Sequence, residues 1–319
     1  MDEKINRLLK YLEQPKKSIL TLHRSPDGDS IGSNLAFYHI LRYFGHEVDV
    51  ISKDPIPDNL LFLPGSQKIT LLNPKKINWT NYDYYWALDM SSPEMLGENV
   101  QFPDNVKIIT IDHHSTNSKW GHFNIIDAKT ISTCSIIFDL CKKSEIIVNN
   151  KIATCLLTGI LTDSGFFSYI TDPAPLKDAQ ELLQYNVNFQ NIMFHLQKKS
   201  PFEDLVFIGK ALATAKLYKE KKVAFISVDN ELWTTYGKSV DKNRYLTPYA
   251  RDIADTNLGV VLIEEQPKSI RVELRSRNLE YDVSVLAQKL GGGGHKAASG
   301  ARIEGKTIRG AIQLILKLI

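Results

Sequence analysis

The sequence predicts an α/β protein of two domains, with an N-terminal parallel-sheet domain and a smaller C-terminal α/β domain joined by a helical connector. A length of 319 residues corresponds to about two domains at roughly 150 residues each. Short apolar runs alternate with amphipathic stretches through the first half, and this pattern changes to continuous helical periodicity near Pro173. The composition, 43% hydrophobic and 24% charged, is that of a folded globular protein and excludes disordered, collagen-like and coiled-coil chains.

The N-terminal half contains strand candidates that are short, apolar and rich in Ile, Val, Leu or Tyr, as buried parallel strands are. They lie at residues 18–23, 47–52, 84–89 and 107–113. A helical pattern at 30–44 separates the first two and ends before Gly45, a residue typical of the position after a helix. Strands that alternate with helices predict a parallel sheet.

The second half begins with helical periodicity from 173 to 220, in which Pro173, Pro175 and Pro201 mark helix starts. Further strands are expected at 223–228, 259–264 and 270–277, followed by a short helix at 286–290, a run of four glycines and a final helix at 307–318. We therefore expect three parts: residues 1–190, a helical connector at 191–218, and residues 219–319.

Charge is unevenly distributed, although the net charge is only +3. Residues 271–319 carry nine Lys+Arg and four Asp+Glu, which leaves the rest of the chain slightly acidic. An acidic part and a basic part fit a site that holds cations and a polyanionic substrate, although a solvated basic surface would have the same composition.

The expected compartment is the cytoplasm. The N-terminus lacks the apolar segment of a secretion signal, and no stretch reaches the roughly 18–20 apolar residues of a membrane span. The three cysteines match no metal motif, so we expect reduced, buried core thiols.

The most informative segment runs from His23 to Ser33, HRSPDGDSIGS. His23 ends a strand, and Asp27 and Asp29 lie on the loop before a helix, which is the edge of an open α/β sheet where ligands bind. One imidazole and two carboxylates at this spacing can converge on a cation. The alternative is structural: Asp27 and Gly28 would form a turn and Asp29 would cap the helix.

Other apolar segments end in the same residue types. Asp89 follows the third strand, and Asp112, His113 and His114 follow the fourth. Strand alternation would point His113 and His114 to opposite faces and give them different roles if the strand continues that far. Asp163 ends a fourth apolar run, and chance rarely places such a residue after every segment.

Together these segments offer two imidazoles and four carboxylates and no thiolate, a donor set that favours Mn²⁺, with Mg²⁺ or Co²⁺ as alternatives. The donors are too many for one catalytic ion with open positions, so we expect two divalent cations that share a carboxylate, an arrangement that hydrolyses phosphoesters. The candidate metal ligands are His23, Asp27, Asp29, Asp89, His113 and Asp163.

The chain resembles the DHH phosphoesterases, whose four motifs are similar, in order, to HRSPDGDSIGS, LDMSS, IDHHSTN and LTDSGFF. RVELRSRN and GGGGHKAASG are similar to the accessory domain called DHHA1. The resemblance covers nearly the whole chain and is nearest to the standalone nanoRNase/pAp phosphatase type. One departure is Ser164, where the family frequently has Thr; it leaves Asp163 in place.

This resemblance assigns roles in the first domain. One ion would be held by His23, Asp27 and Asp89, and the second by Asp29, Asp89, His113 and Asp163. The catalytic residues would be Asp89, which bridges the ions; Asp112, which orients an imidazole; and His114, which assists the leaving oxygen. The two ions would activate the attacking water.

In the C-terminal domain, strand alternation places Arg271, Arg275 and Arg277 on one face, where they would be free to grip phosphate, unless this is an edge strand with solvated arginines. The glycine run allows close backbone approach to an anion. The resemblance assigns substrate binding to Arg275, Ser276, Arg277, Gly293, Gly294 and His295.

The implied function is hydrolysis of short oligoribonucleotides and of 3′-phosphoadenosine 5′-phosphate (pAp). The alternative within the same fold is a phosphodiesterase of linear or cyclic dinucleotides such as pApA, pGpG or cyclic di-AMP. A non-catalytic, metal-dependent nucleotide sensor would need a broken ligand set, which this sequence lacks. No extended basic stripe for long nucleic acid is evident. No membrane partner is expected, and a homodimer is an open expectation.

Overall fold

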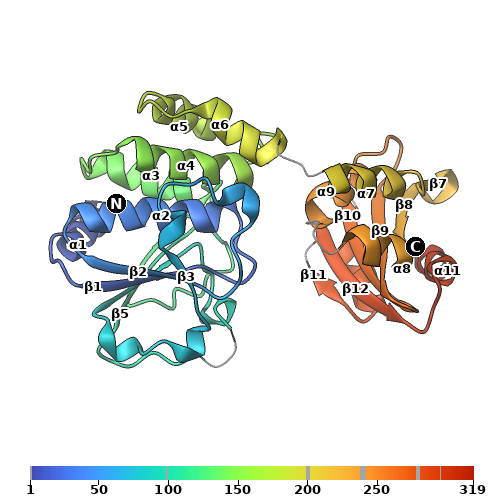
Figure 1. Ribbon diagram of the computed structural model, residues 1–319, viewed down its shortest axis with the longest axis horizontal. Coiled ribbons are helices and arrows are strands. Elements are labelled where there is room, and N and C mark those ends of the chain that lie inside the picture. The colour runs from blue at the N-terminus through green and yellow to red at the C-terminus, as the bar shows by residue number, and fades with distance from the viewer. Residues whose placement is uncertain (1, 98–99, 199–201, 238–241, 278–280, 295) are drawn as a thin grey trace. The chain divides into compact units, whose positions relative to one another are not determined.

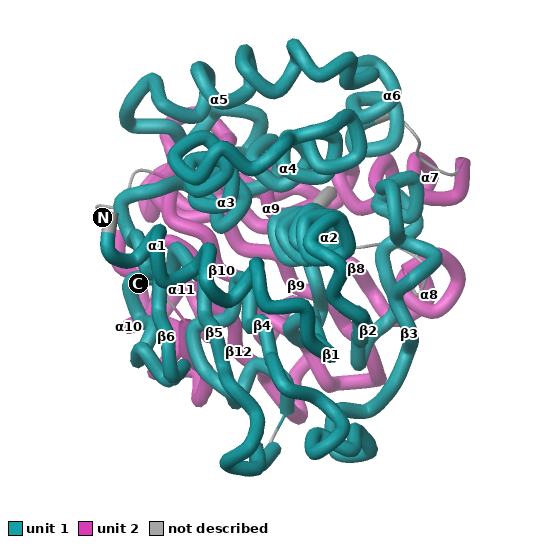
Figure 2. Tube along the Cα trace, turned by 90° about the vertical axis from the view of Figure 1, so that its left-hand side faces the viewer, with its two compact units in different colours: residues 1–199 teal, residues 200–319 magenta. Residues whose placement is uncertain are grey.

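The computed structural model describes residues 2–97, 100–198, 202–237, 242–277, 281–294 and 296–319. The chain divides into two compact units, residues 1–199 and 200–319, which Figure 2 shows in two colours. Each unit has its own sheet and its own hydrophobic core. Within the described residues, no helix has both the length and the apolar character needed to span a bilayer.

Unit 1 is built on a parallel sheet of six strands in its described part, in the order β3-β2-β1-β4-β5-β6. Figure 2 shows the strands side by side in this order. Their bounds are β1 Lys17–Thr21, β2 Glu47–Ser52, β3 Ile69–Leu71, β4 Tyr84–Leu88, β5 Lys107–Asp112 and β6 Phe123–Ile126. The chain moves outward from β1 to β3 and then returns to start β4 on the other side of β1, so the strand order reverses between β1 and β4.

Helices cover one face of this sheet, with α2 against the strands, α3 and α4 above it, and α5 and α6 outermost (Figure 1). Their bounds are α1 Asp2–Leu12, α2 Gly28–Tyr43, α3 Thr133–Lys143, α4 Asn150–Asp163, α5 Ala174–Leu183 and α6 Phe189–Met193. The main core lies between helices and sheet and includes Leu20 and Trp86, both fully buried. Alternate strand residues such as Ile19 and Tyr85 point to the other face, where they pack against irregular segments and short 3-10 turns.

Unit 2 contains a mixed sheet in the order β11-β12-β10-β9-β8-β7, in which β8 and β9 are parallel and the other neighbours antiparallel. Its strands are β7 Lys216–Tyr218, β8 Val223–Val228, β9 Leu258–Gln266, β10 Ser269–Ser276, β11 Gly293–Gly294 and β12 Ala298–Glu304. Its helices are α7 Phe202–Leu212, α8 Asn230–Leu232, α9 Lys242–Arg251, α10 Val283–Lys289 and α11 Ile308–Leu318.

The predicted α/β class and parallel first sheet are confirmed. The expected strands at 47–52 and 223–228 match β2 and β8, and the others differ by one or two residues at their ends. The stretch from 173 to 220 is less continuous than expected, because α5, α6 and α7 are separated and β7 begins at Lys216. The cysteines are free and buried, as predicted.

Candidate active site

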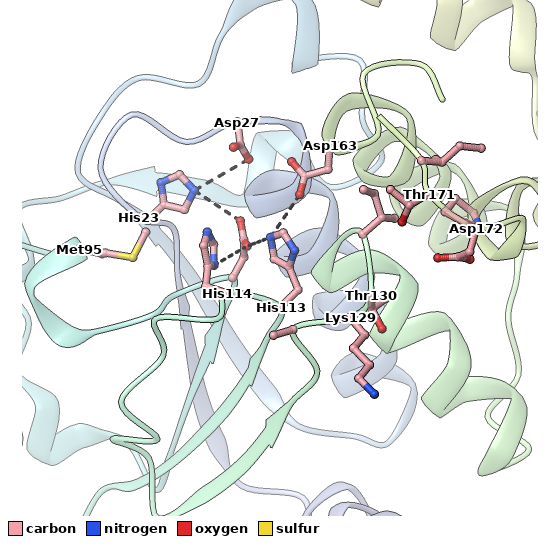
Figure 3. Close-up of a pocket in the computed structure, with 15 residues that line it drawn as sticks. His23, Asp27, Met95, His113, His114, Lys129, Thr130, Asp163, Thr171 and Asp172 are labelled. Atoms are coloured by element: carbon pink, nitrogen blue, oxygen red, sulfur yellow. Dashed lines mark ion pairs between the residues drawn. The ribbon is translucent and has the colours of Figure 1, made fainter. Parts of the chain in front are cut away.

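The candidate site lies at the carboxyl ends of β1, β4 and β5, beside the point where the strand order reverses. This is the edge at which open α/β sheets bind ligands, because loops from neighbouring strands diverge there and leave a crevice. Figure 3 shows the side chains of His23, Asp27, His113, His114 and Asp163 converging at this place. The cavity they line has a volume of about 590 Å³.

Asp27 both caps helix α2 and faces the site. Its Oδ1 accepts hydrogen bonds from the backbone N–H groups of Asp29 (3.1 Å) and Ser30 (3.0 Å), so α2 begins at Gly28, two residues earlier than expected. The same oxygen lies 3.9 Å from Nε2 of His23. The structural alternative for this loop is therefore correct about capping, but the cap is Asp27 rather than Asp29, and capping leaves its carboxylate facing the site.

Asp89 lies at the centre of the site. Its backbone has a φ of 56°, a left-handed conformation that turns the chain immediately after β4. The buried carboxylate lies 3.5 Å from Nε2 of His23, 3.6 Å from Nε2 of His113 and 3.7 Å from Nδ1 of His114. Burial raises the pKa of Asp89, but the hydrogen bond and charge of His23 and the charges of the other two imidazoles outweigh it and lower that pKa.

His113 and His114 do not point to opposite faces, because β5 ends at Asp112 and the backbone no longer alternates. Their ring centroids are 4.5 Å apart and both rings approach Asp89, yet their second partners differ. Nε2 of His113 lies 3.3 Å from Oδ2 of Asp163. Nδ1 of His114 donates to Oδ1 of Asp112 at 2.7 Å, and this contact raises the pKa of His114.

Asp29 is completely buried between α2 and the start of α3. Its two carboxylate oxygens accept the backbone N–H groups of Thr133 (2.7 Å) and Cys134 (3.0 Å). Burial, with the charge of Asp89, raises the pKa of Asp29 well above its ordinary value. Burial and the charges of Asp29, Asp27 and Asp89 likewise raise the pKa of Asp163 to about 10.

These donors form three overlapping groups whose ligand atoms lie within 4.8 Å of one another. The groups are His23, Asp27 and Asp89; Asp29, His113 and Asp163; and Asp89, His113 and His114. The donor set fits divalent cations, because buried carboxyl groups with raised pKa values lose their protons once a cation neutralises them. All six expected ligands are thus brought together.

The structure adds residues to the cavity that sequence patterns do not predict. Thr130, on the loop after β6, accepts a hydrogen bond from His113 through its backbone and lines the wall with Met95 and Asp172. Lys129 also lines the cavity, and Figure 3 shows its side chain turned away from the acidic cluster. These residues lie on loops without periodicity; only their closeness to predicted strand ends could have indicated them.

The substrate-binding residues expected in unit 2 are partly brought together. Arg275, Gly293 and Gly294 line one hollow of about 540 Å³. Arg302, on a strand that the sequence analysis missed, lines it as well. Ser276 is buried beside it on β10, and its Oγ has no hydrogen-bond partner within the described part of the chain.

The expectation that the arginines of β10 are free is wrong. Arg271 donates to Oε1 of Glu265 at 2.9 Å and forms a shorter ion pair with Glu273, and Arg275 lies 3.8 Å from the same Glu273. β10 is an inner strand rather than an edge, because it pairs with both β9 and β12.

Arg277 is exposed and lines a different hollow, of about 450 Å³, with Lys222, Asp255 and Asn257. The structure therefore does not place it with Arg275. His295 lies outside the described residues.

Family models match both halves of the chain. The model described as "DHH family, N-terminal domain" matches residues 17–160, and the "DHHA1 domain" matches residues 244–319. A Thermus thermophilus protein named bifunctional oligoribonuclease and PAP phosphatase NrnA is 30% identical over 322 residues, covering 99% of this chain and 92% of that protein. The chain belongs to the DHH family. The resemblance inferred from the sequence motifs is confirmed, and DHH family phosphoesterases are hydrolases.

The chain is also similar to other proteins and solved structures. The Bacillus subtilis protein of the same name is 26% identical, covering 89% of this chain and 88% of its own. The crystal structure of an exopolyphosphatase-related protein from Bacteroides fragilis superposes with a TM-score of 0.89 and 26% identity, covering 100% of this chain and 96% of that one. Exonuclease RecJ bound to manganese superposes with a TM-score of 0.50 and 14% identity, which shows a shared fold.

Proposed function

We propose that this chain is a metal-dependent phosphoesterase that hydrolyses short oligoribonucleotides and pAp. The observation that carries the proposal is that four carboxylates and two imidazoles converge at the reversal point of a parallel sheet, where all of them except the fully buried Asp29 line one cavity. The names of the Thermus thermophilus and Bacillus subtilis relatives support this choice of substrates.

His23, Asp27 and Asp89 would hold one divalent cation, and Asp29, Asp89, His113 and Asp163 the other; we propose Mn²⁺, with Mg²⁺ or Co²⁺ as alternatives. Such ions supply an acidified water and neutralise charge on the phosphoryl oxygens. Two of the three groups of neighbouring donors support this assignment. One group contains His23, Asp27 and Asp89, and the other contains Asp29, His113 and Asp163, to which the shared Asp89 would be added.

The protein's own contribution is to fix the donors and to move a proton. Asp112 is fully buried and holds Nδ1–H of His114, so Nε2 is the ring nitrogen left to exchange a proton with the leaving oxygen. Oδ2 of Asp112 accepts from the side chain of Asn117 at 2.6 Å, which fixes the carboxylate that orients the ring.

We further propose a functional division of the chain into a catalytic part at 1–190, a connector at 191–218 and a substrate-binding part at 219–319. In the last part, Arg275, Gly293 and Gly294 line a hollow that could take a substrate phosphate. Ser276, Arg277 and His295 belong to the same proposed assignment.

The test is Mn²⁺-dependent turnover of a substrate panel, followed by product chromatography. The panel contains pAp, pApA, pGpG, cyclic di-AMP, pyrophosphate, a five-nucleotide RNA and a 24-nucleotide RNA. Preferential turnover of pAp and the five-nucleotide RNA supports the proposal. Turnover confined to dinucleotides or cyclic di-AMP would replace it with a signalling phosphodiesterase, and no turnover by the metal-loaded protein would overturn it.

A further inference from the structure

A second, basic hollow lies on the same sheet edge as the acidic site. It has a volume of about 300 Å³ and is lined by three cationic side chains, those of Arg24, Lys53 and Lys75. The rest of its wall is polar or apolar: Asn73, Pro74, Leu96, Gly97 and Val100.

The three cations come from three different strand ends. Arg24 follows β1, Lys53 is the residue after β2, and Lys75 lies on the turn after β3. The carboxyl ends of parallel strands share one edge of the sheet, so this hollow lies over β1 to β3 as the acidic site lies over β1, β4 and β5. The edge is thus divided into an acidic part and a basic part.

The wall between the two hollows is thin. His23 and Met95 line the acidic cavity, whereas their neighbours Arg24 and Leu96 line the basic one. The backbone joins these segments, since the N–H of Arg24 donates to the carbonyl oxygen of Met95 at 3.0 Å. A nucleic-acid strand that places one phosphate at the acidic site can therefore place another in the basic hollow. Only the segments joined by the Arg24–Met95 hydrogen bond separate the two hollows.

The three cations are available to a ligand. None forms an ion pair with any acidic side chain in the described residues, and each is exposed. The nearby carboxylate of Asp54 is engaged elsewhere, because its Oδ2 accepts the N–H of Ser25 at 2.8 Å. Three cationic side chains that form no ion pair among the described residues, gathered in one hollow, suit an anion with several oxygens, such as a phosphodiester.

We propose that this hollow, here called the basic hollow, binds a backbone phosphate of the substrate strand at a distance from the phosphate being cleaved. This inference rests on the proposed function and adds a preference for longer substrates. Strands long enough to span both hollows should bind more tightly than pAp and dinucleotides, which are too short to do so. The site belongs to unit 1 alone and is independent of the arginines of β10.

The experiment measures binding without turnover, by fluorescence anisotropy in Mn²⁺ with ligands whose phosphate linkages cannot be hydrolysed. The ligands are labelled adenosine monophosphate, a dinucleotide and a five-nucleotide RNA. The test variant is Lys53→Ala/Lys75→Ala, and the matched control is Lys10→Ala/Lys68→Ala, which removes two exposed lysines of unit 1 that do not line the basic hollow. Thermal unfolding verifies that both variants are folded, and Lys53→Met/Lys75→Met replaces the test variant if the alanine form is unfolded.

The test variant should raise the Kd for the five-nucleotide RNA roughly tenfold, the size of one charge-assisted contact, and lower the salt slope by about 0.7. The Kd for the dinucleotide and the mononucleotide should change by less than about twofold in the same variant. The control should leave all three unchanged within that margin.

Equal losses for all three ligands would mean that the basic hollow binds a free nucleotide phosphate, and equal losses in the control would mean that only net charge matters; either overturns the proposal. The assay requires no turnover, so it gives a result even if the substrate panel shows no phosphoesterase activity. Failure of the proposed function and failure of the basic hollow are therefore distinguishable.

Discussion

Gly159 on α4 faces the carboxylate of Asp29 on α2, and a Cβ at position 159 would lie 2.8 Å from Asp29 Oδ1. Gly32, one turn along α2, approaches α4 equally closely, because a Cβ there would lie 2.6 Å from the carbonyl oxygen of Cys155. Glycines at the crossing allow the two helices to pack closely, which brings Asp29 and Asp163 into one group of candidate metal donors. The close packing of α2 and α4 therefore also determines where Asp29 lies in the site.

Gly159→Ala should damage the site more than the fold. The new methyl group would clash with the Cys134 thiol as well as with the Asp29 carboxylate, so these side chains must move or the helices must separate. We therefore expect at least a tenfold loss of Mn²⁺-dependent turnover, because small misplacements of catalytic groups cost about that much or more. The overpacking should lower the free energy of unfolding by about 1–3 kcal/mol. Turnover and thermal unfolding measure the two effects.

The matched control is Gly209→Ala on α7, where the added methyl group would have no described atom within 4 Å apart from the local helix backbone. Alanine has the higher helix propensity, so this variant should be as stable as the parent or slightly more stable. If both variants retain full turnover, close packing at Gly159 does not determine the position of Asp29.

Much of the fold could be predicted because apolar runs are bounded by polar strand ends. β2 and β8 are found at the predicted residues for this reason. β6 and β12 were missed because FNII is very short and ASGARIE is rich in small residues, so neither shows a clear alternation. Helix α1 has Ile5, Leu8 and Leu12 at helical spacing and is buried on that face, so its sequence carries a helical signal.

The metal donors could be predicted because they lie at the ends of apolar segments or within a few residues after them. The ion pair between Arg271 and Glu265 could not be predicted, because it forms only when β10 folds back on β9. The cavity residues Thr130 and Asp172 also require the three-dimensional structure, because their loops carry no periodic pattern.

Asp89→Asn should remove activity while the fold persists. Asparagine tolerates the left-handed backbone found at this position and has nearly the same shape, but it lacks the charge that three imidazoles face. We expect turnover to fall by roughly 10³-fold or more and one bound ion to be lost, measured by elemental analysis after dialysis. Asp139→Asn, on the exposed face of α3, is the control and should keep both.

Metal removal should destabilise unit 1. Buried carboxylates at the site repel one another without a cation, and an ion that binds only the folded state adds RT ln(1 + [L]/Kd), about 2.7 kcal/mol at a hundredfold excess over Kd. The difference in thermal unfolding between EDTA and Mn²⁺ should therefore be larger in the parent than in Asp89→Asn, which keeps at most one ion. An equal Mn²⁺ effect in both proteins would contradict metal binding at this site.

His46 should make the protein sensitive to acid. Burial lowers its pKa from the ordinary value of 6.5. Nε2–H donates to the carbonyl oxygen of Leu12, and Nδ1 accepts from Ser18 Oγ (3.0 Å) and from the backbone N–H of Lys16 (3.4 Å), so a proton on Nδ1 would face two donors.

The free energy of unfolding should depend on pH because the folded and unfolded chains bind protons differently at His46. Below about pH 6.5 the unfolded chain binds a proton at His46 that the folded chain does not, so the free energy of unfolding falls as the pH decreases. His46→Gln should be less stable at pH 8 but should lose less stability between pH 7.5 and 5 than the parent does. His122→Gln, on an exposed loop, is the control, and a parent-like slope in His46→Gln would show that other groups cause the acid sensitivity.

Asn117 should act on catalysis through Asp112 without touching the substrate. Its side-chain amide donates to Asp112 Oδ2 at 2.6 Å and to the Met90 carbonyl oxygen at 3.2 Å, so it fixes the carboxylate that orients His114. Removing such an orienting partner typically costs about 10–100-fold in activity. We therefore expect Asn117→Ala to lower kcat by roughly that factor while KM and bound metal change little, because His23, Asp27 and Asp163 keep their positions. Asn117→Asp should be at least as damaging, since it sets a second negative charge against Asp112, whereas a variant that loses metal and kcat together would assign Asn117 to the metal site itself.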